Sequence, residues 1–190
     1  PDDQLTEISV PGRRVRRTME LPPTSGGSAC GPTWAEPGTD GRFVYVACNG
    51  GSEVYEVALG EDSLRVVRRF ATGQAPYNLE VTSDGRLLLA TNKAEGSVSV
   101  IGLEAGRELK RIRTSRDVTH GVVASPDSRY AFVSNEAVGA TRSTVDVLDL
   151  EERRRVATVE VEHQAGGIDF WTTERPEREP RGAPRRPPGR

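Results

Sequence analysis

The sequence predicts an all-β fold in which four-stranded antiparallel sheets repeat along the chain. Three observations support this prediction. The 190-residue chain resembles itself with a period of about 43 residues. Each period contains four runs rich in β-branched residues, separated by turn signals such as Asp-Gly and Glu-Gly. No segment shows a sustained apolar period of about 3.6 residues, which argues against a helical solenoid of similar repeat length.

The repeat is clearest in a phrase that ends on Asn49, Asn92 and Asn135. Before each asparagine, Asp-Gly-Arg or Asp-Ser-Arg leads into an apolar run. The first copy has one extra residue, which predicts a β-bulge near Ala47 and Cys48. A period of this length that contains strands is typical of the blades of a β-propeller. The repeated phrases are residues 40–46, 84–89 and 127–133.

The four strands of a blade follow in order from residue type. In the middle copy we expect them at residues 77–82, 87–92, 97–103 and 108–114. The second strand is nearly all apolar, as expected if neighbouring sheets cover both of its faces. The third alternates between apolar and polar residues. The fourth is rich in arginine, which protects an exposed edge strand from pairing with another chain.

The strand pattern predicts three full blades at residues 31–72, 76–114 and 119–161. Residues 5–21 fit the two outer strands of an earlier blade, and residues 166–171 fit the closing inner strand of another. Propellers need about four to eight blades to close a ring. We therefore expect residues 1–171 to form an incomplete ring, the C-terminal part of a longer, seven-bladed chain. The Pro/Arg-rich residues 172–190 are expected to be a disordered tail.

The same phrases resemble the YVTN-type β-propeller family, named for a Tyr-Val-Thr-Asn run at the end of the second strand. That run reads Tyr-Val-Ala-Cys-Asn at residues 45–49, Leu-Ala-Thr-Asn at 89–92 and Phe-Val-Ser-Asn at 132–135. The family's Ser-Pro-Asp-Gly turn is matched by residues 125–128. The resemblance implies a bacterial protein exported to the periplasm or the cell exterior. It is specific for the fold and not for function, because propellers host many unrelated activities.

Composition excludes several classes of function. The net charge of −2 argues against a nucleic-acid-binding protein, which would normally be clearly basic. No apolar run is long enough for a membrane span. The only two cysteines, Cys30 and Cys48, fall on adjacent predicted strands, close to diagonal partners. They leave two alternatives open, a disulfide in an exported protein or two buried thiols in a cytosolic one.

Ligand-binding residues are expected in the loops that enter the first strand and leave the second, because these loops surround the central channel on one face. His120 is the most reactive of them near neutral pH. It has no second ligand at metal-binding spacing, so we assign no metal site, no cofactor and no catalytic residue. The candidate ligand-binding residues are Trp34, Tyr77, Asn78, Lys93, Arg116, His120 and Glu136.

The residues that recur in every repeat have structural explanations. We expect the repeated asparagine to hydrogen-bond the backbone of the following turn. The aspartate of each Asp-Gly-Arg or Asp-Ser-Arg phrase is interpreted as a turn former on the opposite face. Neither is predicted to be catalytic.

The leading functional hypothesis is a non-enzymatic binding or scaffold module whose ligand is an unknown protein or small molecule. The exposed blade faces would be covered by missing blades of the same chain or by a second copy. The first alternative is a propeller lactonase resembling 6-phosphogluconolactonase, with His120 and Arg116 near a sugar-acid substrate. The second is the propeller subunit of a redox enzyme of the amine dehydrogenase or haem nitrite reductase type. No nucleophile elbow, phosphate-binding loop, zinc helix or haem-attachment motif is present in the sequence.

Overall fold

A computed structural model describes residues 3–137 and 139–171, and in this part of the chain every regular element is a β-strand. The strands divide into a two-stranded ribbon and three four-stranded sheets. The strands are β1 (Gln4–Ser9), β2 (Arg14–Glu20), β3 (Pro32–Pro37), β4 (Phe43–Cys48), β5 (Glu53–Leu59), β6 (Leu64–Ala71), β7 (Pro76–Val81), β8 (Leu87–Asn92), β9 (Ser97–Gly102), β10 (Arg107–Arg113), β11 (Val118–Ala124), β12 (Tyr130–Glu136), β13 (Thr144–Asp149) and β14 (Arg154–Glu160).

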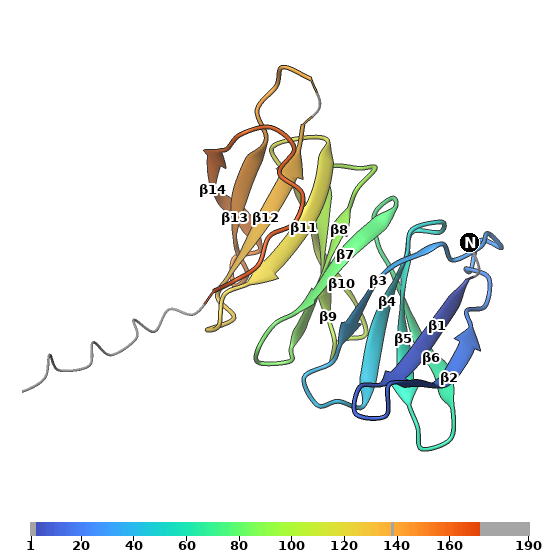
Figure 1. The fold of residues 1–190 in the computed structure, drawn as a ribbon. Helices are drawn as coiled ribbons and strands as arrows, with labels where there is room; N and C mark the ends of the chain where they lie inside the picture. The colour runs from blue at the N-terminus through green and yellow to red at the C-terminus, as the bar shows by residue number, and fades with distance from the viewer. Residues whose placement is uncertain (1–2, 138, 172–190) are drawn as a thin grey trace, which may run out of the picture.

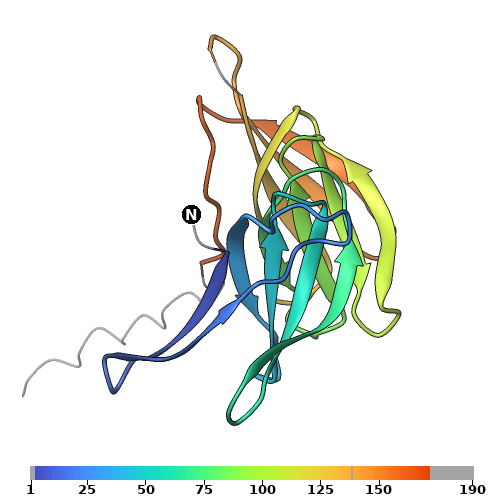
Figure 2. The ribbon, with the colours of Figure 1, turned by 90° about the vertical axis from the view of Figure 1, so that its right-hand side faces the viewer.

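The three four-stranded sheets are the three full blades. Each is antiparallel, and its strands pair in chain order, from β3 to β6, from β7 to β10 and from β11 to β14. Figure 1 shows the sheets side by side in an arc, from the blue β1–β2 ribbon to the orange β14. Figure 2, a view turned by 90°, shows this ribbon at the edge of the arc beside the first full blade. The predicted incomplete β-propeller is therefore confirmed.

Within the middle blade, the four predicted strands agree with β7 to β10 to within one residue at each end. The predicted turn chemistry is also present. Gly85 adopts a φ of 69°, a left-handed conformation that side chains resist. The Asp84 carboxylate accepts a hydrogen bond from the Arg86 N–H at 3.0 Å. Asp40 and Asp127 accept the same bond two residues on, so the repeated aspartate is a turn former.

The apolar core lies between the blades rather than within any one of them. Along β8, Leu88 and Ala90 pack into the cluster shared with the first full blade, whereas Leu89 packs into the cluster shared with the third. A third cluster joins the β1–β2 ribbon to the first blade. The second strand of a blade is therefore apolar on both faces because each face meets a neighbouring sheet. The outermost strand β14 is exposed along its whole length.

The strand pairing aligns the first repeat with the second one residue differently from the alignment of their sequences. Cys48 pairs with Pro32 and Glu53, as Asn92 pairs with Pro76 and Ser97. Cys48, not Asn49, therefore occupies the position of Asn92. The irregularity expected near Ala47 and Cys48 is present, but its extra residue is Thr33 on the facing strand β3, whereas β4 pairs with β5 without a register shift.

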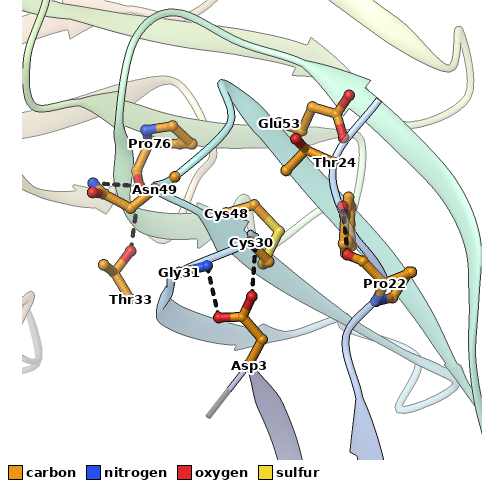
Figure 3. The surroundings of a disulfide bond; sticks show 12 residues. Asp3, Pro22, Thr24, Cys30, Gly31, Thr33, Cys48, Asn49, Glu53 and Pro76 are labelled. Atoms are coloured by element: carbon orange, nitrogen blue, oxygen red, sulfur yellow. Dashed lines mark hydrogen bonds between the residues drawn. A yellow bond between two sulfur atoms is a disulfide. The ribbon is translucent and has the colours of Figure 1, made fainter. Parts of the chain in front are cut away.

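The structure joins Cys30 and Cys48 in a disulfide, with Cα atoms 4.4 Å apart. Figure 3 shows the carboxylate of Asp3 beside this bridge, where it accepts hydrogen bonds from the Cys30 and Gly31 N–H groups at 2.8 and 3.0 Å. The bridge stands where the other blades use an asparagine. It links the segment before β3 covalently to the end of β4. The hydrogen bonds of Asp3 hold the start of β1 at the same place.

The repeated asparagine does not bond to the following turn as expected. Asn92 Nδ2 donates to the hydroxyls of Ser97 and Ser99, and Asn135 Nδ2 donates to Thr144 and Asp146, all on the third strand of the same blade. The reason is that both asparagines lie inside the sheet and are fully buried, so the neighbouring strand is their available partner. Asn49, one residue beyond β4, donates instead to the Pro76 carbonyl of the next blade (Figure 3).

Residues 166–171, expected to be a closing inner strand, form no strand with the part of the chain that the structure describes. The segment nevertheless lies against the third full blade. The Ser134 hydroxyl donates a hydrogen bond to the Gly166 carbonyl, and the rings of Phe132 and Phe170 lie 6.2 Å apart. The expected tail, 172–190, lies outside the described residues. In the part described here, no helix has the length and apolar character needed to cross a bilayer.

Candidate functional site

A cavity of about 330 Å³ lies where the three inner strands β3, β7 and β11 meet the segment that follows β14. We call this cavity the channel pocket, because the inner strands of a propeller face its central channel. Its wall combines aromatic, polar and acidic side chains with apolar ones. The side chains used below are Trp34, Glu36, Tyr77, Asn78, Glu80, His120 and Asp169.

Irregularities at the start of each inner strand bring side chains to this pocket. Thr33 is an extra residue in the pairing of β3 with β4, and His120 is an extra residue in the pairing of β11 with β12. In β7 the register shifts across Tyr77 and Asn78. A bulge bends its strand and redirects the side chains next to it. Thr91 holds two of these irregularities together, since its hydroxyl accepts the Asn78 N–H at 2.9 Å and donates to the His120 carbonyl at 2.9 Å.

Tyr77 is the centre of an aromatic and charged group at the mouth of the channel pocket. Its ring centre lies 4.7 Å from that of His120. The Lys93 ammonium lies 4.3 Å from the centre of the Tyr77 ring, at cation–π distance. Lys93 also lies 3.9 Å from a Glu136 carboxylate oxygen. A base, a phenol ring and a cation are thus held in contact by three strand ends.

The surroundings of His120 keep its imidazole neutral. Burial lowers the pKa of His120 below its ordinary value of 6.5, and the positive charge of Lys93 lowers it further. Glu136 and the Gly166 backbone oppose this shift in pKa. A neutral imidazole at pH 7 is able to accept a proton, which a protonated one is not.

Two carboxylates of the pocket were not predicted from the sequence, Glu36 on β3 and Glu80 on β7. Burial raises the pKa of Glu80 to about 7, against a hydrogen bond from the Ala124 N–H, and the charges of Glu36 and Asp169 raise it further. Burial also raises the pKa of Glu36, opposed by a hydrogen bond from Trp34. Each glutamate stands two residues after a predicted site residue, Trp34 or Asn78, so the period of two along a strand was the signal that would have found them.

The structure brings six of the seven candidate ligand-binding residues together and separates one. Arg116 points away from the pocket: its guanidinium donates to the Arg142 carbonyl at 3.1 Å and lies 3.4 Å from a Glu160 carboxylate oxygen. The expectation that Arg116 and His120 face one substrate is therefore not met. The six that lie in or at the mouth of the pocket are Trp34, Tyr77, Asn78, Lys93, His120 and Glu136.

The other histidine lies elsewhere. His163 has its Nδ1 3.0 Å from the Thr141 carbonyl, in the loop between β12 and β13, and it is exposed. Among the described residues, no three histidine, cysteine, aspartate or glutamate side chains converge as metal ligands would.

The four-stranded antiparallel blades and the pocket on their inner strands define the chain as part of a β-propeller. Residues 36–126 match the model of a family described as lactonase, 7-bladed beta-propeller. This match includes Glu36, Tyr77, Glu80 and His120. No curated protein matches the chain.

Three solved structures illustrate the likeness in fold. A hydrazine synthase chain from Kuenenia stuttgartiensis is 25% identical, with a TM-score of 0.66, over 73% of this chain and 38% of its own. A proposed 6-phosphogluconolactonase from Bacteroides fragilis is 14% identical, with a TM-score of 0.64, over 85% of this chain and 52% of its own. A protein of unknown function from Desulfotomaculum acetoxidans is 17% identical, with a TM-score of 0.66, over 87% and 50%. The chain therefore spans about half or less of the length of these structures.

Proposed function

We propose that the chain is part of a lactone-hydrolysing propeller and that the channel pocket is its substrate site. The observation that carries this proposal is the His120 imidazole, whose ring centre lies 4.7 Å from that of Tyr77 in a pocket whose strands β3 to β11 fall largely within the lactonase match. Burial lowers the pKa of His120, which favours the neutral form that accepts a proton. The likeness in fold to a proposed 6-phosphogluconolactonase supports the same class of reaction. A lactonase-type reaction is favoured here over a non-enzymatic scaffold.

The chemistry assigned to the pocket is general-base hydrolysis of a cyclic ester. The His120 imidazole takes a proton from water as the water oxygen bonds to the lactone carbonyl carbon. The bond from that carbon to the ring oxygen then breaks, and the imidazolium returns the proton to the ring oxygen. The product is one hydroxy acid, so water is consumed and no other reactant is needed.

Three neighbours assist this reaction in the proposal. Asn78 Oδ1 accepts the Val122 N–H at 2.8 Å, which fixes the amide plane and leaves Nδ2 as a donor for a substrate oxygen. The Lys93 ammonium, held over Tyr77, stabilises the negative charge that develops on the carbonyl oxygen. Tyr77 keeps Lys93 and His120 in place and covers one side of the bound ring.

The proposal is tested by following acid release from δ-gluconolactone, above its spontaneous hydrolysis, with the 190-residue chain. We expect His120→Ala to lower the enzymatic rate by about 100-fold or more, since general-base catalysis contributes ~10²–10⁴. His163→Ala is the matched control and should keep the full rate, because His163 lies outside the pocket. Equal rates for the two variants, or no rate above the spontaneous one, would contradict a lactonase.

A redox-enzyme subunit is the second candidate, and the likeness to hydrazine synthase is the observation that favours it. Cofactor-dependent activity in the complete assembly, with no lactone hydrolysis, would favour that candidate. Saturable binding of a protein or small molecule without turnover would favour the scaffold. We further propose that the protein is a YVTN-type propeller of an oxidising compartment, the periplasm or cell exterior, which the Cys30–Cys48 disulfide supports.

A further inference from the structure

We propose that the channel pocket selects an uncharged, hydroxyl-rich lactone ring and discriminates against a phosphorylated one. This inference rests on the proposed function and names its substrate class. It is carried by the charges of the pocket wall: Glu36, Glu80 and Asp169 line the cavity, and among the residues that the structure describes no arginine or lysine does. Proteins bind phosphate groups with arginine, lysine or backbone N–H groups at a helix N-terminus, and the described part of this chain has no helix.

Two cations near the pocket, Lys93 and Arg116, lie outside its lining. Lys93, at the mouth, lies over the Tyr77 ring and near Glu136. Arg116 is directed to Glu160 and to a backbone carbonyl. A phosphate group that entered the cavity would therefore meet carboxylates without a guanidinium to neutralise it, and like charges brought together weaken binding strongly.

The wall of the pocket suits hydroxyl groups. Carboxylates accept hydrogen bonds from hydroxyls, and the half-exposed Trp34 offers an apolar ring face for the carbon skeleton. Trp34 Nε1 donates to Glu36 Oε2 at 3.2 Å, so ring and carboxylate act as one surface. The volume of about 330 Å³ is near the lower end of small-molecule pockets, which suits a single sugar-sized ring.

Of the two glutamates on the inner strands, Glu36 is the more available to a ligand. Glu80 already accepts the Ala124 N–H of the next inner strand through Oε1 at 3.1 Å. Glu36, at the equivalent position of β3, bonds within the described part of the chain to Trp34 of the same strand. We therefore assign to Glu36 the main role in the selection against negative charge, and to Glu80 a supporting one.

The test uses two probes that are not hydrolysed, δ-gluconolactam and its 6-phosphate, and reads binding from Trp34 fluorescence. The chain has two tryptophans, and Trp171→Phe removes the other one, which is 88% exposed. In this background we expect the phosphate probe to bind at least about tenfold more weakly than the uncharged lactam. Glu36→Gln should reduce the ratio of the two dissociation constants, phosphate probe to uncharged lactam, severalfold. Glu61→Gln, an equal change of charge at an exposed turn outside the pocket, should leave it unchanged.

Binding of the phosphate probe as tight as that of the uncharged lactam overturns the inference, as does an unchanged ratio in Glu36→Gln or no binding of either probe. These results are separate from the proposed function. Hydrolysis that depends on His120 but is equally fast for both lactones would leave the lactonase in place and remove the selection. Preferential binding of the uncharged lactam without hydrolysis would support the selection and contradict the lactonase.

Discussion

The two interfaces between full blades use different side chains to bond across the gap. Between the first and second blades, Arg68 of the outer strand β6 pairs with the buried Glu56 and donates to the Leu103 carbonyl of the next blade at 2.8 Å. On the inner strand β3 of the same interface, the Thr33 hydroxyl donates to the Tyr77 carbonyl at 3.0 Å. Between the second and third blades, side chains of the inner strand make the hydrogen bonds. There Asn78 and Glu80 of β7 accept N–H groups of β11, at 2.8 and 3.1 Å.

This difference decides which side chains are free for function. Trp34 and Glu36 of β3 stand at the positions of Asn78 and Glu80, 44 residues earlier, as the pairing of β3 and β7 with their neighbours shows. At the first interface it is Thr33, between these positions and the strand start, that bonds to β7, through the Pro76 and Tyr77 carbonyls. Trp34 and Glu36 bond to each other and face the channel pocket instead.

The outer grooves between blades show the same contrast. The groove at the first interface, into which Arg68, Tyr45 and Glu56 project, holds about 170 Å³. The corresponding groove at the second interface holds about 600 Å³. An arginine that reaches across one groove and not the other accounts for the smaller volume.

The largest expected effect is on Arg68. Arg68→Ala leaves the Glu56 carboxylate, 2% exposed, without its ionic partner and should cost about 3–5 kcal/mol of unfolding free energy. Urea denaturation measures this. Arg111→Ala, on the fourth strand of the second blade, removes only partly exposed pairs with Glu95 and Glu108 and should cost below about 1 kcal/mol. Similar losses in the two variants would remove the asymmetry between the interfaces.

The disulfide comes next. Replacing Cys30 and Cys48 by serine opens a loop closed by a bridge of sequence separation 18, for which we expect a loss of about 2–4 kcal/mol. Thermal unfolding with and without a reductant is the measurement, and reductant should have no effect on the double variant. If reductant leaves the melting temperature of the wild-type chain unchanged, the bridge does not stabilise the first blade.

The hydrogen bond from Val122 to Asn78 is tested by comparing Asn78→Ala with Trp34→Ala, the equivalent change one blade earlier. Asn78→Ala leaves the buried Val122 N–H without an acceptor and should cost about 1–3 kcal/mol. Trp34, 45% exposed, should cost less in stability but more in binding of the lactam probe. Chemical denaturation gives the free energy of unfolding of both variants, and probe titration gives their dissociation constants for the lactam. A larger loss of stability in Trp34→Ala would reverse the assignment of roles.

The smallest effect is a dependence of stability on pH from Glu80. Its pKa of about 7 in the folded chain lies above the ordinary 4.5, so it contributes stability below pH 4.5 that is lost as the pH rises through 7. Partial exposure limits the change to on the order of 1–2 kcal/mol. Glu80→Gln keeps an acceptor for Ala124 and should flatten this part of the profile. Parallel pH profiles of the two chains would show that Glu80 does not titrate in this window.

The channel pocket was predictable only in part. Side chains at the entrance of each inner strand were found because loop positions follow from the strand order, which gave Tyr77, Asn78 and His120. Glu36 and Glu80 were missed because they lie inside strands, where an acidic residue looks like any solvent-facing one until the neighbouring strand is in place. Arg116 was wrongly placed because a long side chain in a loop can turn to either face.

The sequence by itself determined the blade: its period, its four strands, its turns and the apolar second strand all follow from local residue chemistry and alternation. Only the tertiary structure decided the register of the first repeat, where Cys48 and not Asn49 takes the asparagine position. It also decided that Asn78 and Glu80 bond to the next inner strand, whereas Trp34 and Glu36 bond to each other and face the channel pocket. The physical reason is that pairing between blades involves contacts about 44 residues apart, and local pattern carries no information on which of two equivalent side chains will find a partner there.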